Sequence, residues 1–315
     1  MKSKAVITSI SGTKLKKNEA DLFRKYKPWG IILFKRNISS FNQLKSLIKS
    51  IKKVTRDKKY PILIDEEGGS VSRMSRLFNN NVYSQKFFAD IYNSDKKIGI
   101  FLYKNYISSI CSIFKLLGIN INTVPVLDIL RKNTHGIIGS RSYSSNKKTI
   151  INLGKLCVKF YKKNKIGTTV KHIPGHGGAS VDSHKNLPIV NIKKRELNSM
   201  DFSCFKNINS FFAMTAHIIY KSLDSKNACT HSKIIIKKII RKRIGFKGIL
   251  ISDDLSMKAL KYDLLTNARK SLSAGCNLVL YCSGKYKDSR KLLKELPLID
   301  SFTAKKTSEF YKFLS

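Results

Sequence analysis

Residues 167–188 read GTTVKHIPGHGGASVDSHKNLP, and this stretch joins a strand pattern to a segment rich in reactive side chains. Gly167–Val170 is a short run of the kind that forms a buried strand. Pro174 and the glycines after it exclude a regular helix, so Lys171–Pro188 is predicted to be a loop. Loops held by a rigid scaffold often carry catalytic groups. We therefore look for chemistry in this loop first.

Two side chains of the loop form a candidate acid/base pair. Asp182 and His184 are two positions apart, so the carboxylate can orient the imidazole and favour its charged form. The three histidines of the loop, His172, His176 and His184, raise the alternative of a metal site. No cysteine or helical His-Glu motif supports that alternative, and zinc sites usually show tighter spacing. We expect no metal here, and expect His176 to shape the loop through hydrogen bonds to the backbone.

Short apolar runs followed by polar residues recur along the chain. They alternate with longer segments whose apolar residues have the spacing of a helix. The runs are Ala5–Ile7, Gly30–Phe34, Pro61–Ile64, Ile121–Val126, Gly167–Val170, Phe211–Thr215, Gly248–Ile251 and Asn277–Tyr281. The helical segments include Phe41–Val54, Lys96–Leu117, Thr149–Asn164, Ser232–Arg243 and Thr266–Ala274. Alternation predicts parallel strands, and eight repeats predict a closed (β/α)8 barrel, the TIM barrel. A doubly wound open sheet is the alternative.

Polar residues follow several of these runs closely, where a barrel would place its active site. They are Asp65, Asp128, Lys171 with His172, His217, and Ser252 with Asp253. This regularity favours one catalytic domain over residues 1–315, without a linker or a second domain. Asp253 could serve as a nucleophile, a base or a metal ligand, or have a structural role alone. For Asp254 we expect the capping of the next helix.

The segment after the third run carries a second group of candidate ligands. Asp65 precedes two glutamates and two glycines, a composition that lets a ligand approach the backbone while the carboxylate accepts hydrogen bonds from hydroxyls. Glu66 and Glu67 are expected to face solvent or to pair with nearby cations. Arg73 and Arg141 could clamp polar groups of a substrate.

Composition limits the class of protein. Lys and Arg number 61 against 20 Asp and Glu, which gives a net charge of +41. These cations are spread along the chain without a recognition motif, so we interpret them as a solvated basic surface and expect no specific nucleic-acid partner. The six cysteines lack a Cys-x-x-Cys pair, which favours free thiols in a reducing compartment. No apolar run approaches the ~20 residues of a membrane span. We expect a cytoplasmic protein.

Taken together, the blocks resemble glycoside hydrolase family 3, in particular its NagZ-type β-N-acetylhexosaminidase branch, which acts in peptidoglycan recycling. The main blocks are Lys171–Gly177, Asp182–His184 with Leu187–Pro188, and Ser252–Leu255. The supporting blocks are Ile32–Asn37, Ile64–Gly69, Pro125–Asp128, Gly139–Ser142 and Ala216–Tyr220. They occur in the expected order, and the histidine-containing loop separates this branch from the glucosidases of the family.

The resemblance implies a single-domain barrel and a retaining two-step mechanism without a cofactor. Asp253 matches the nucleophile, and His184 matches the general acid/base with Asp182 as its partner. The residues that match the binding of an N-acetylglucosamine unit are Asp65, Arg73, Arg141, Lys171 and His172. The implied substrate is N-acetylglucosamine β-1,4-linked to anhydromuramic acid, with or without its peptide. We expect a monomer that binds this small carbohydrate and neither nucleic acid nor membrane.

Two positions depart from the family pattern, since Glu66 stands where glutamine is expected and Ser70 where arginine is common. Three alternatives to hydrolysis by this mechanism stay open. Phosphate could replace water as the acceptor, because a histidine base repels phosphate less than a carboxylate does. The acetamido group of the substrate could attack, with Asp65 and Glu66 acting as a carboxylate pair. The barrel could also bind sugars or nucleic acid without turnover. The glycines beside His176 suggest that the loop moves when substrate binds.

Overall fold

Eight parallel strands close into a barrel in this computed structural model, which describes residues 3–131, 134, 136, 138–179 and 187–315. The strands are β1 (Lys4–Thr8), β2 (Pro28–Leu33), β3 (Ile62–Ile64), β4 (Ile121–Asn122), β5 (Gly167–Ile173), β7 (Phe212–Thr215), β9 (Ile249–Asp254) and β10 (Leu278–Leu280). The first and last strands pair through Val6 with Val279 and Ile7 with Leu280. This pairing confirms the (β/α)8 barrel and excludes the open sheet.

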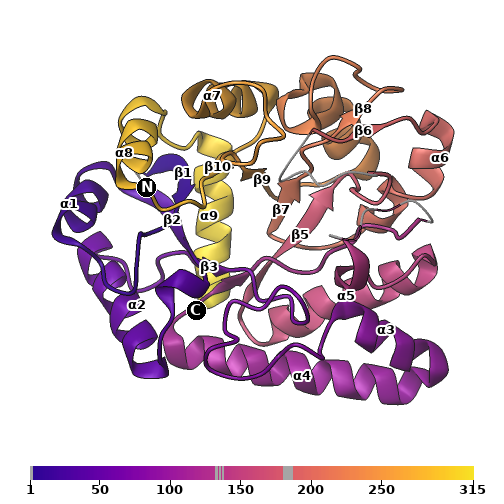
Figure 1. The fold of residues 1–315 in the computed structure, drawn as a ribbon, viewed down its shortest axis with the longest axis horizontal. Coiled ribbons are helices and arrows are strands. Elements are labelled where there is room, and N and C mark those ends of the chain that lie inside the picture. Colours follow the sequence, from indigo (N-terminus) through magenta and orange to yellow (C-terminus); the bar gives the residue numbers. More distant parts are fainter. Residues whose placement is uncertain (1–2, 132–133, 135, 137, 180–186) are drawn as a thin grey trace.

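Helices surround the barrel and connect successive strands (Figure 1). They are α1 (Lys17–Tyr26), α2 (Phe41–Thr55), α3 (Gln85–Ser94), α4 (Lys96–Leu117), α5 (Lys147–Lys163), α6 (Lys194–Ser199), the π-helical η5 (Ile235–Ile244), α7 (Leu264–Ala274), α8 (Tyr286–Glu295) and α9 (Ser301–Leu314). All five helices named from the sequence are present. Helices α1, α3, α6, α8 and α9 were not among them. A second, two-stranded sheet pairs β6 (Ile189–Val190) with β8 (Ile219–Tyr220).

Helix α2 illustrates why these segments are helical. The Ser40 side chain accepts a hydrogen bond from the Gln43 backbone N–H and so caps the first turn. Leu44, Leu47, Ile48 and Ile51 recur at three- and four-residue intervals and are buried, which places one apolar face of α2 against the barrel. The helix ends at Thr55, one residue beyond the predicted boundary.

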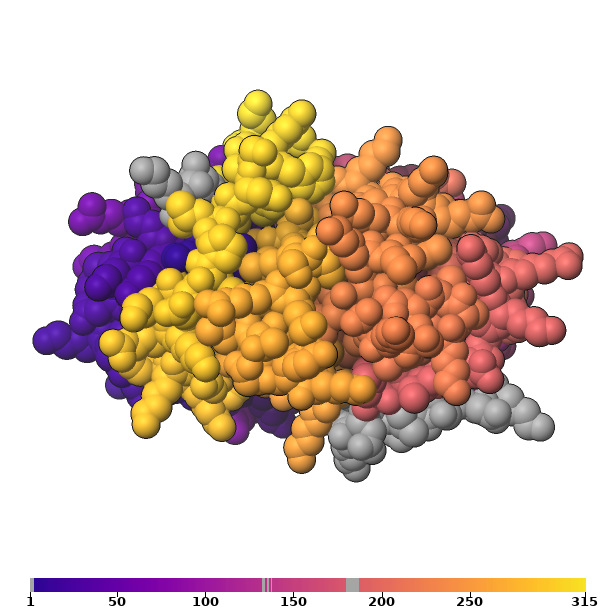
Figure 2. Space-filling model, turned by 90° about the horizontal axis from the view of Figure 1, so that it is seen from above, coloured from indigo at the N-terminus to yellow at the C-terminus, as the bar shows by residue number. Residues whose placement is uncertain are grey.

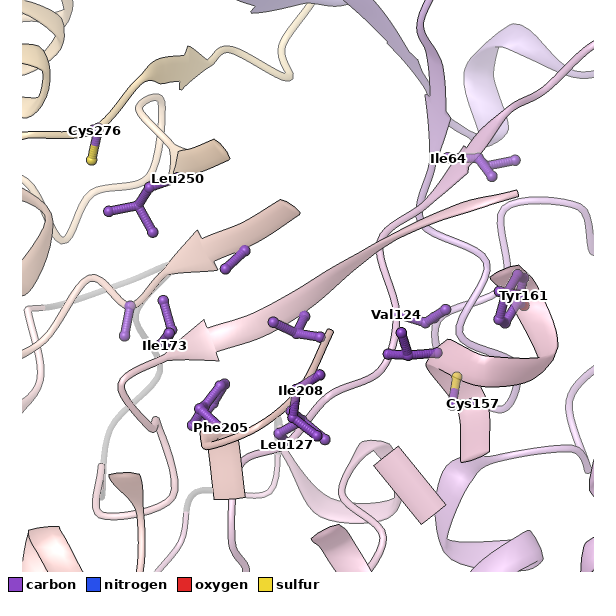
Figure 3. Close-up of a cluster of buried hydrophobic side chains, with 14 of the residues drawn as sticks. Ile64, Val124, Leu127, Cys157, Tyr161, Ile173, Phe205, Ile208, Leu250 and Cys276 are labelled. Carbon is purple, nitrogen blue, oxygen red and sulfur yellow. The ribbon is translucent and has the colours of Figure 1, made fainter. Parts of the chain in front are cut away.

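The apolar layer between the strands and the helices forms the larger core. Its members come from the outward faces of the strands and the inward faces of the helices. Figure 3 shows part of this layer around β5, to which Leu127, Ile173, Phe205 and Ile208 all belong. Cys157 of α5 is buried in the same layer, and the six cysteines are free, as the sequence predicted.

A second apolar cluster fills the inside of the barrel and closes its N-terminal end. The ring of Trp29 lies 5.5 Å from that of Phe212, and Phe212 lies 5.0 Å from Phe310 of α9. Gly167 begins β5 under this helix, and a Cβ atom there would lie 2.8 Å from the Phe310 ring. Helix α9 therefore covers the floor of the barrel (Figure 1).

The two ends of the chain meet at the closure of the barrel. The space-filling view shows yellow C-terminal residues beside indigo N-terminal ones (Figure 2), and α1 contacts α8. Within the described residues, no helix is both long and apolar enough to cross a membrane.

Candidate active site

The site arises because the inward faces of the strands continue past the apolar core. Alternate residues of a strand point to the same side. Leu63 and Ile251 belong to the cluster inside the barrel, so Asp65 and Asp253, two positions further on, face the same interior at its C-terminal end. Lys171 reaches this mouth from β5, which extends to Ile173. The prediction that the loop begins at position 171 was therefore wrong, because Lys171 and His172 belong to the strand.

These side chains line one cavity of about 460 Å³. Its lining includes seven of the polar residues discussed above, namely Asp65, Glu67, Arg73, Arg141, Lys171, His172 and Asp253. Apolar contacts come from Phe34, Met214 and Leu280. The structure thus brings together all six of the described residues that the sequence analysis named for catalysis and sugar binding.

Asp65 and Lys171 form the centre of a buried ionic network. The Lys171 Nζ donates to Asp65 Oδ1 over 2.9 Å and to the Thr123 hydroxyl over 3.0 Å. Arg73 Nη2 lies 3.1 Å from Asp65 Oδ2. Burial opposes ionisation of Asp65, but the charges of Lys171 and Arg73 outweigh it and hold the pKa of this carboxyl well below its usual range. Asp65 is therefore an anion that can accept hydrogen bonds from hydroxyl groups.

Glu67 links the two remaining cations of the network. Its oxygens accept from Arg141 Nε at 2.8 Å and Arg141 Nη2 at 2.9 Å, and its Oε1 lies 2.7 Å from Lys171 Nζ. Burial raises the pKa of Glu67, but Arg141 and Lys171 outweigh it and lower the value to about 2. Pairing of Glu67 with cations is confirmed.

The expectation for Glu66 was wrong, because this side chain does not face solvent and pairs with no cation among the described residues. Glu66 is 1% exposed. Its carboxylate accepts from the backbone N–H groups of Arg73 and Met74 and from the Asn80 side chain. It therefore shapes the segment that carries Arg73. Since Glu66 is turned into this segment, it is not placed to act as one of a pair with Asp65.

His172 and His176 are held by one carboxylate behind the cavity. Asp128 Oδ2 lies 2.6 Å from His172 Nδ1, and Asp128 Oδ1 accepts from the His176 backbone N–H at 2.6 Å. Burial, together with the neighbouring His172, lowers the pKa of His176 to about 4. His176 is therefore neutral near pH 7, which agrees with a role in shaping the loop.

Asp253 lies at the end of β9 and opens into the cavity. Burial opposes its ionisation, but His172, His217 and the Asp254 backbone N–H favour the anion, so the pKa of Asp253 is lower than usual. The Asp254 N–H donates to Asp253 Oδ1 over 2.8 Å. An ionised carboxylate fixed in this way is suited to attack an electrophilic carbon.

The role predicted for Asp254 was wrong. It caps a turn rather than a helix, since its oxygens accept from the Ser256 backbone N–H and from the Cys282 backbone N–H. The next helix, α7, begins ten residues later and is capped by Asp263. The strand-to-helix connection is longer than the sequence suggested, and it contributes Asp254 and Met257 to the cavity lining.

Asp182 and His184 lie outside the described residues, so their predicted pairing stays a prediction. The loop base before them is held firmly. The Thr134 hydroxyl donates to the Gly177 carbonyl over 2.6 Å, and a Cβ atom at Gly177 would lie 1.8 Å from the Ile129 carbonyl oxygen. Gly177 thus allows close packing of two backbones, and the suggested movement of the loop on substrate binding stays a prediction.

Two site residues were missed by the sequence reasoning. Thr123 and Glu67 both contact Lys171, yet no motif singled out Thr123, and Glu67 was not assigned to the site. Strand periodicity could have found Thr123, which follows the buried Ile121 by two positions. Within the part of the chain that the structure describes, no group of three or more His, Cys, Asp or Glu side chains could hold a metal ion.

Comparison with known proteins places this site in a family. The glycosyl hydrolase family 3 N terminal domain matches residues 3–305. A β-hexosaminidase of Haemophilus influenzae is 31% identical over 285 residues, which cover 89% of this chain and 79% of that protein.

Two solved structures show the same fold over nearly the whole chain. NagZ from Neisseria gonorrhoeae, crystallised with N-trifluoroacetyl-D-glucosamine, has a TM-score of 0.87 at 27% identity, with coverage of 100% of this chain and 91% of that one. A family 3 β-N-acetylglucosaminidase from a Paenibacillus species has a TM-score of 0.86 at 25% identity, and the match covers 98% of this chain but 60% of that longer protein. The ionic network, the nucleophile-like Asp253 and these matches lead to one conclusion: the chain belongs to glycoside hydrolase family 3 and is similar to its β-hexosaminidases.

Proposed function

We propose that this chain is an exo-acting, retaining β-N-acetylglucosaminidase that removes N-acetylglucosamine from β-1,4-linked anhydromuropeptides during cell-wall recycling. One observation carries the proposal: the ionised Asp253 opens into the same cavity as the network of Asp65, Lys171 and Arg73. A sugar ring held by that network presents its hydroxyl groups to Asp65 and its anomeric carbon to Asp253.

In the proposed mechanism, Asp253 attacks the anomeric carbon while an acid protonates the leaving oxygen, which gives a covalent glycosyl-enzyme. We assign the acid to His184, with Asp182 favouring its imidazolium form. The neutral imidazole then deprotonates the water that releases the sugar. A retaining enzyme needs a nucleophile on one face of the sugar and a proton donor at the leaving oxygen. Of these two, the proposed nucleophile Asp253 lies within the described residues.

We assign the binding of the N-acetylglucosamine unit to Asp65, Arg73, Arg141, Lys171 and His172. Asp65 is an acceptor, whereas Arg73 and Arg141 offer donors, and such a mixture fits the vicinal hydroxyls of a sugar. The ligand named for the gonococcal NagZ structure is an N-acylated glucosamine, and this supports the choice of sugar. One catalytic domain over residues 1–315, a monomeric state and a cytoplasmic location stay predictions.

The proposal is tested with two substrates. The purified chain is incubated with an aryl N-acetyl-β-glucosaminide and with N-acetylglucosaminyl-anhydromuramyl peptides, and the products are identified by mass spectrometry. We expect release of N-acetylglucosamine from both. An aryl glucoside without the acetamido group serves as the control, and equal turnover of that control would contradict the assignment of the sugar.

The same assay separates hydrolysis from transfer to phosphate. Reactions are run with and without inorganic phosphate at the same pH and ionic strength. We expect free N-acetylglucosamine in both. Appearance of N-acetylglucosamine 1-phosphate would show that phosphate, rather than water, is the acceptor. If the protein is folded but hydrolyses neither substrate, a barrel that binds sugars without turning them over is the better description.

A further inference from the structure

Asp128 is a fully buried carboxylate that lies directly behind the cavity. Its side chain is 0% exposed, and among the described residues it is not part of the cavity lining, which includes its neighbour His172. It follows the strand β4 and reaches two segments at once. Its oxygens accept from His172 Nδ1 at 2.6 Å, from the His172 backbone N–H at 3.2 Å and from the His176 backbone N–H at 2.6 Å.

These contacts determine which nitrogen of His172 carries a proton. A carboxylate without a proton only accepts hydrogen bonds. The backbone N–H groups of His172 and His176 can only donate, so Asp128 Oδ1, which both contact, must be an acceptor. Burial disfavours the anion, but His172 and His176 lower the pKa of Asp128 below its usual value. The His172 Nδ1 must therefore donate, and the other ring nitrogen, Nε2, is left for the cavity.

We propose that Asp128 is a positioning residue that fixes the proton of His172 on Nδ1 and, with its other oxygen, fixes the start of the loop at His176. One carboxylate thus sets both the hydrogen-bonding character of a sugar-facing nitrogen and the position of the loop base. The effect on sugar binding rests on the proposed function, whereas the protonation of His172 does not.

The substitution Asp128→Asn tests this assignment because it keeps the shape and removes the charge. The amide oxygen of the asparagine can satisfy the two backbone N–H groups. Its NH2 group then faces His172 Nδ1 and requires that nitrogen to accept a hydrogen bond. The proton moves to Nε2, and the ring offers a donor to the cavity in place of an acceptor. In serine proteases, a buried aspartate holds the catalytic histidine in the correct tautomer, and its replacement by asparagine gives the wrong tautomer.

The direct measurement is the ¹⁵N NMR spectrum of the imidazole nitrogens near neutral pH, without substrate. The chain has six histidines, and the His172 signals are assigned by their loss in His172→Gln. For the neutral ring of the unsubstituted protein we expect the hydrogen on Nδ1 and none on Nε2. For Asp128→Asn we expect hydrogen on Nε2 alone.

Asp201→Asn is the matched control. Asp201 is also a buried carboxylate beside the loop, since its side chain is 1% exposed and a Cβ atom at Gly175 would lie 2.8 Å from its Cβ. It pairs with Arg131 at 2.6 Å rather than with His172. We expect this variant to leave the His172 signals unchanged even if it lowers the melting temperature as much as Asp128→Asn does.

Binding of N-acetylglucosamine and the kinetic constants provide the second readout. We expect Asp128→Asn to weaken binding about tenfold, the loss of one hydrogen bond to the sugar, with a matching rise in KM. In the double variant Asp128→Asn/His172→Gln, we expect no further loss of binding relative to His172→Gln. Additive losses in the double variant would overturn the claim that Asp128 acts through His172.

Two results would overturn the proposal independently of any enzyme assay. One is a spectrum of the unsubstituted protein with hydrogen on Nε2 and none on Nδ1, and this measurement needs no Asp128 variant to fold. The other is an unchanged spectrum in a folded Asp128→Asn variant. If the protonation changes as expected while no glycoside is hydrolysed, the positioning role stands and the proposed function fails.

Discussion

The two ends of the barrel are built from the same strands, yet they differ in almost every physical property. The N-terminal floor is sealed by aromatic rings, since Phe212 contacts both Trp29 and Phe310 of α9. The C-terminal mouth contains buried charges instead, with Lys171 enclosed by Asp65 and Glu67. Apolar burial stabilises the floor, whereas charges at the mouth must be paired to be tolerated away from water.

The contrast shows how a barrel separates stability from chemistry along the length of each strand. In β9 the inward residues run from Ile249 through Ile251 to Asp253, from apolar core to reactive carboxylate within five positions. The predictions below therefore separate into changes at the mouth, which we expect to affect activity, and changes at the floor, which we expect to affect folding.

The largest effect is expected for Asp253→Ala at the mouth. Removal of the nucleophile should lower kcat by roughly 10⁴-fold or more. The melting temperature should fall little or rise, because a buried charge is removed from a site that is not optimised for stability. Steady-state assays and thermal unfolding measure both. Retention of full activity would exclude Asp253 as the nucleophile.

At the floor, Phe310→Ala should have the opposite signature. Phe310 is 0% exposed and contacts the rings of Phe211 and Phe212, so its truncation should lower the free energy of unfolding by about 3–5 kcal/mol. The kcat of the folded fraction at 25 °C should be unchanged. Phe302→Ala is the control, because Phe302 lies on the same helix but is 39% exposed. This substitution should lower the free energy of unfolding far less. A selective loss of kcat in Phe310→Ala would contradict the division between floor and mouth.

Glu67→Gln sharpens the comparison, because here a mouth residue should affect both properties. The substitution leaves Arg141 and Lys171 close together without their shared counter-charge, which should cost about 3 kcal/mol of unfolding free energy and raise KM. The neighbouring Glu66→Gln is the matched control. Among the described residues Glu66 pairs with no cation. One of its oxygens accepts from two backbone N–H groups and the other from the Asn80 amide, so the amide oxygen of glutamine can keep the backbone contacts and the substitution breaks no ion pair. Equal effects of the two substitutions would show that the ion pairs of Glu67 are unimportant.

The pH dependence of stability provides a smaller test at the loop base. Burial and the proximity of His172 lower the pKa of His176 from 6.5 to about 4 in the folded protein, so the unfolded chain binds the proton first as pH falls. Stability should therefore decrease with acidification between pH 6.5 and 4, by about 3 kcal/mol at most for this residue.

Urea unfolding at several pH values measures this slope, and His176→Gln should reduce it. Asp65 and Glu67 have lowered pKa values, so their contribution is lost only at pH values below about 4.5 and does not mask the histidine between pH 4.5 and 6.5. An identical slope in His176→Gln would contradict the assignment to His176.

Most of the barrel was predictable because its signals are local. Each of the eight strands coincides with an apolar run, and the polar residues after these runs gave Asp65, Lys171, His172 and Asp253. What failed depends on contacts between distant segments. Glu66 was expected at the surface, but folding of the segment up to Asn80 over it buries it, and no local pattern predicts that.

The same reason applies to two other contacts. The close approach of the Ile129 backbone requires a glycine at position 177, and no local pattern predicted this contact. Helix α9 was not among the helices named from the sequence. Its role depends on Phe310, whose partners lie about 100 residues or more earlier in the chain. Periodicity identifies the element, but only the packed structure identifies its partner.

The central claim is that Asp253 forms a covalent bond to the sugar. The direct measurement uses a 5-fluoro-N-acetylglucosaminyl fluoride, which slows release of the intermediate, followed by protease digestion and mass spectrometry of the peptides. We predict one sugar adduct per chain, on the peptide that contains Asp253 and on that side chain. An adduct on another residue would contradict the claim. So would the absence of any adduct in a sample that the reagent has inactivated, provided that untreated samples still hydrolyse the natural substrate.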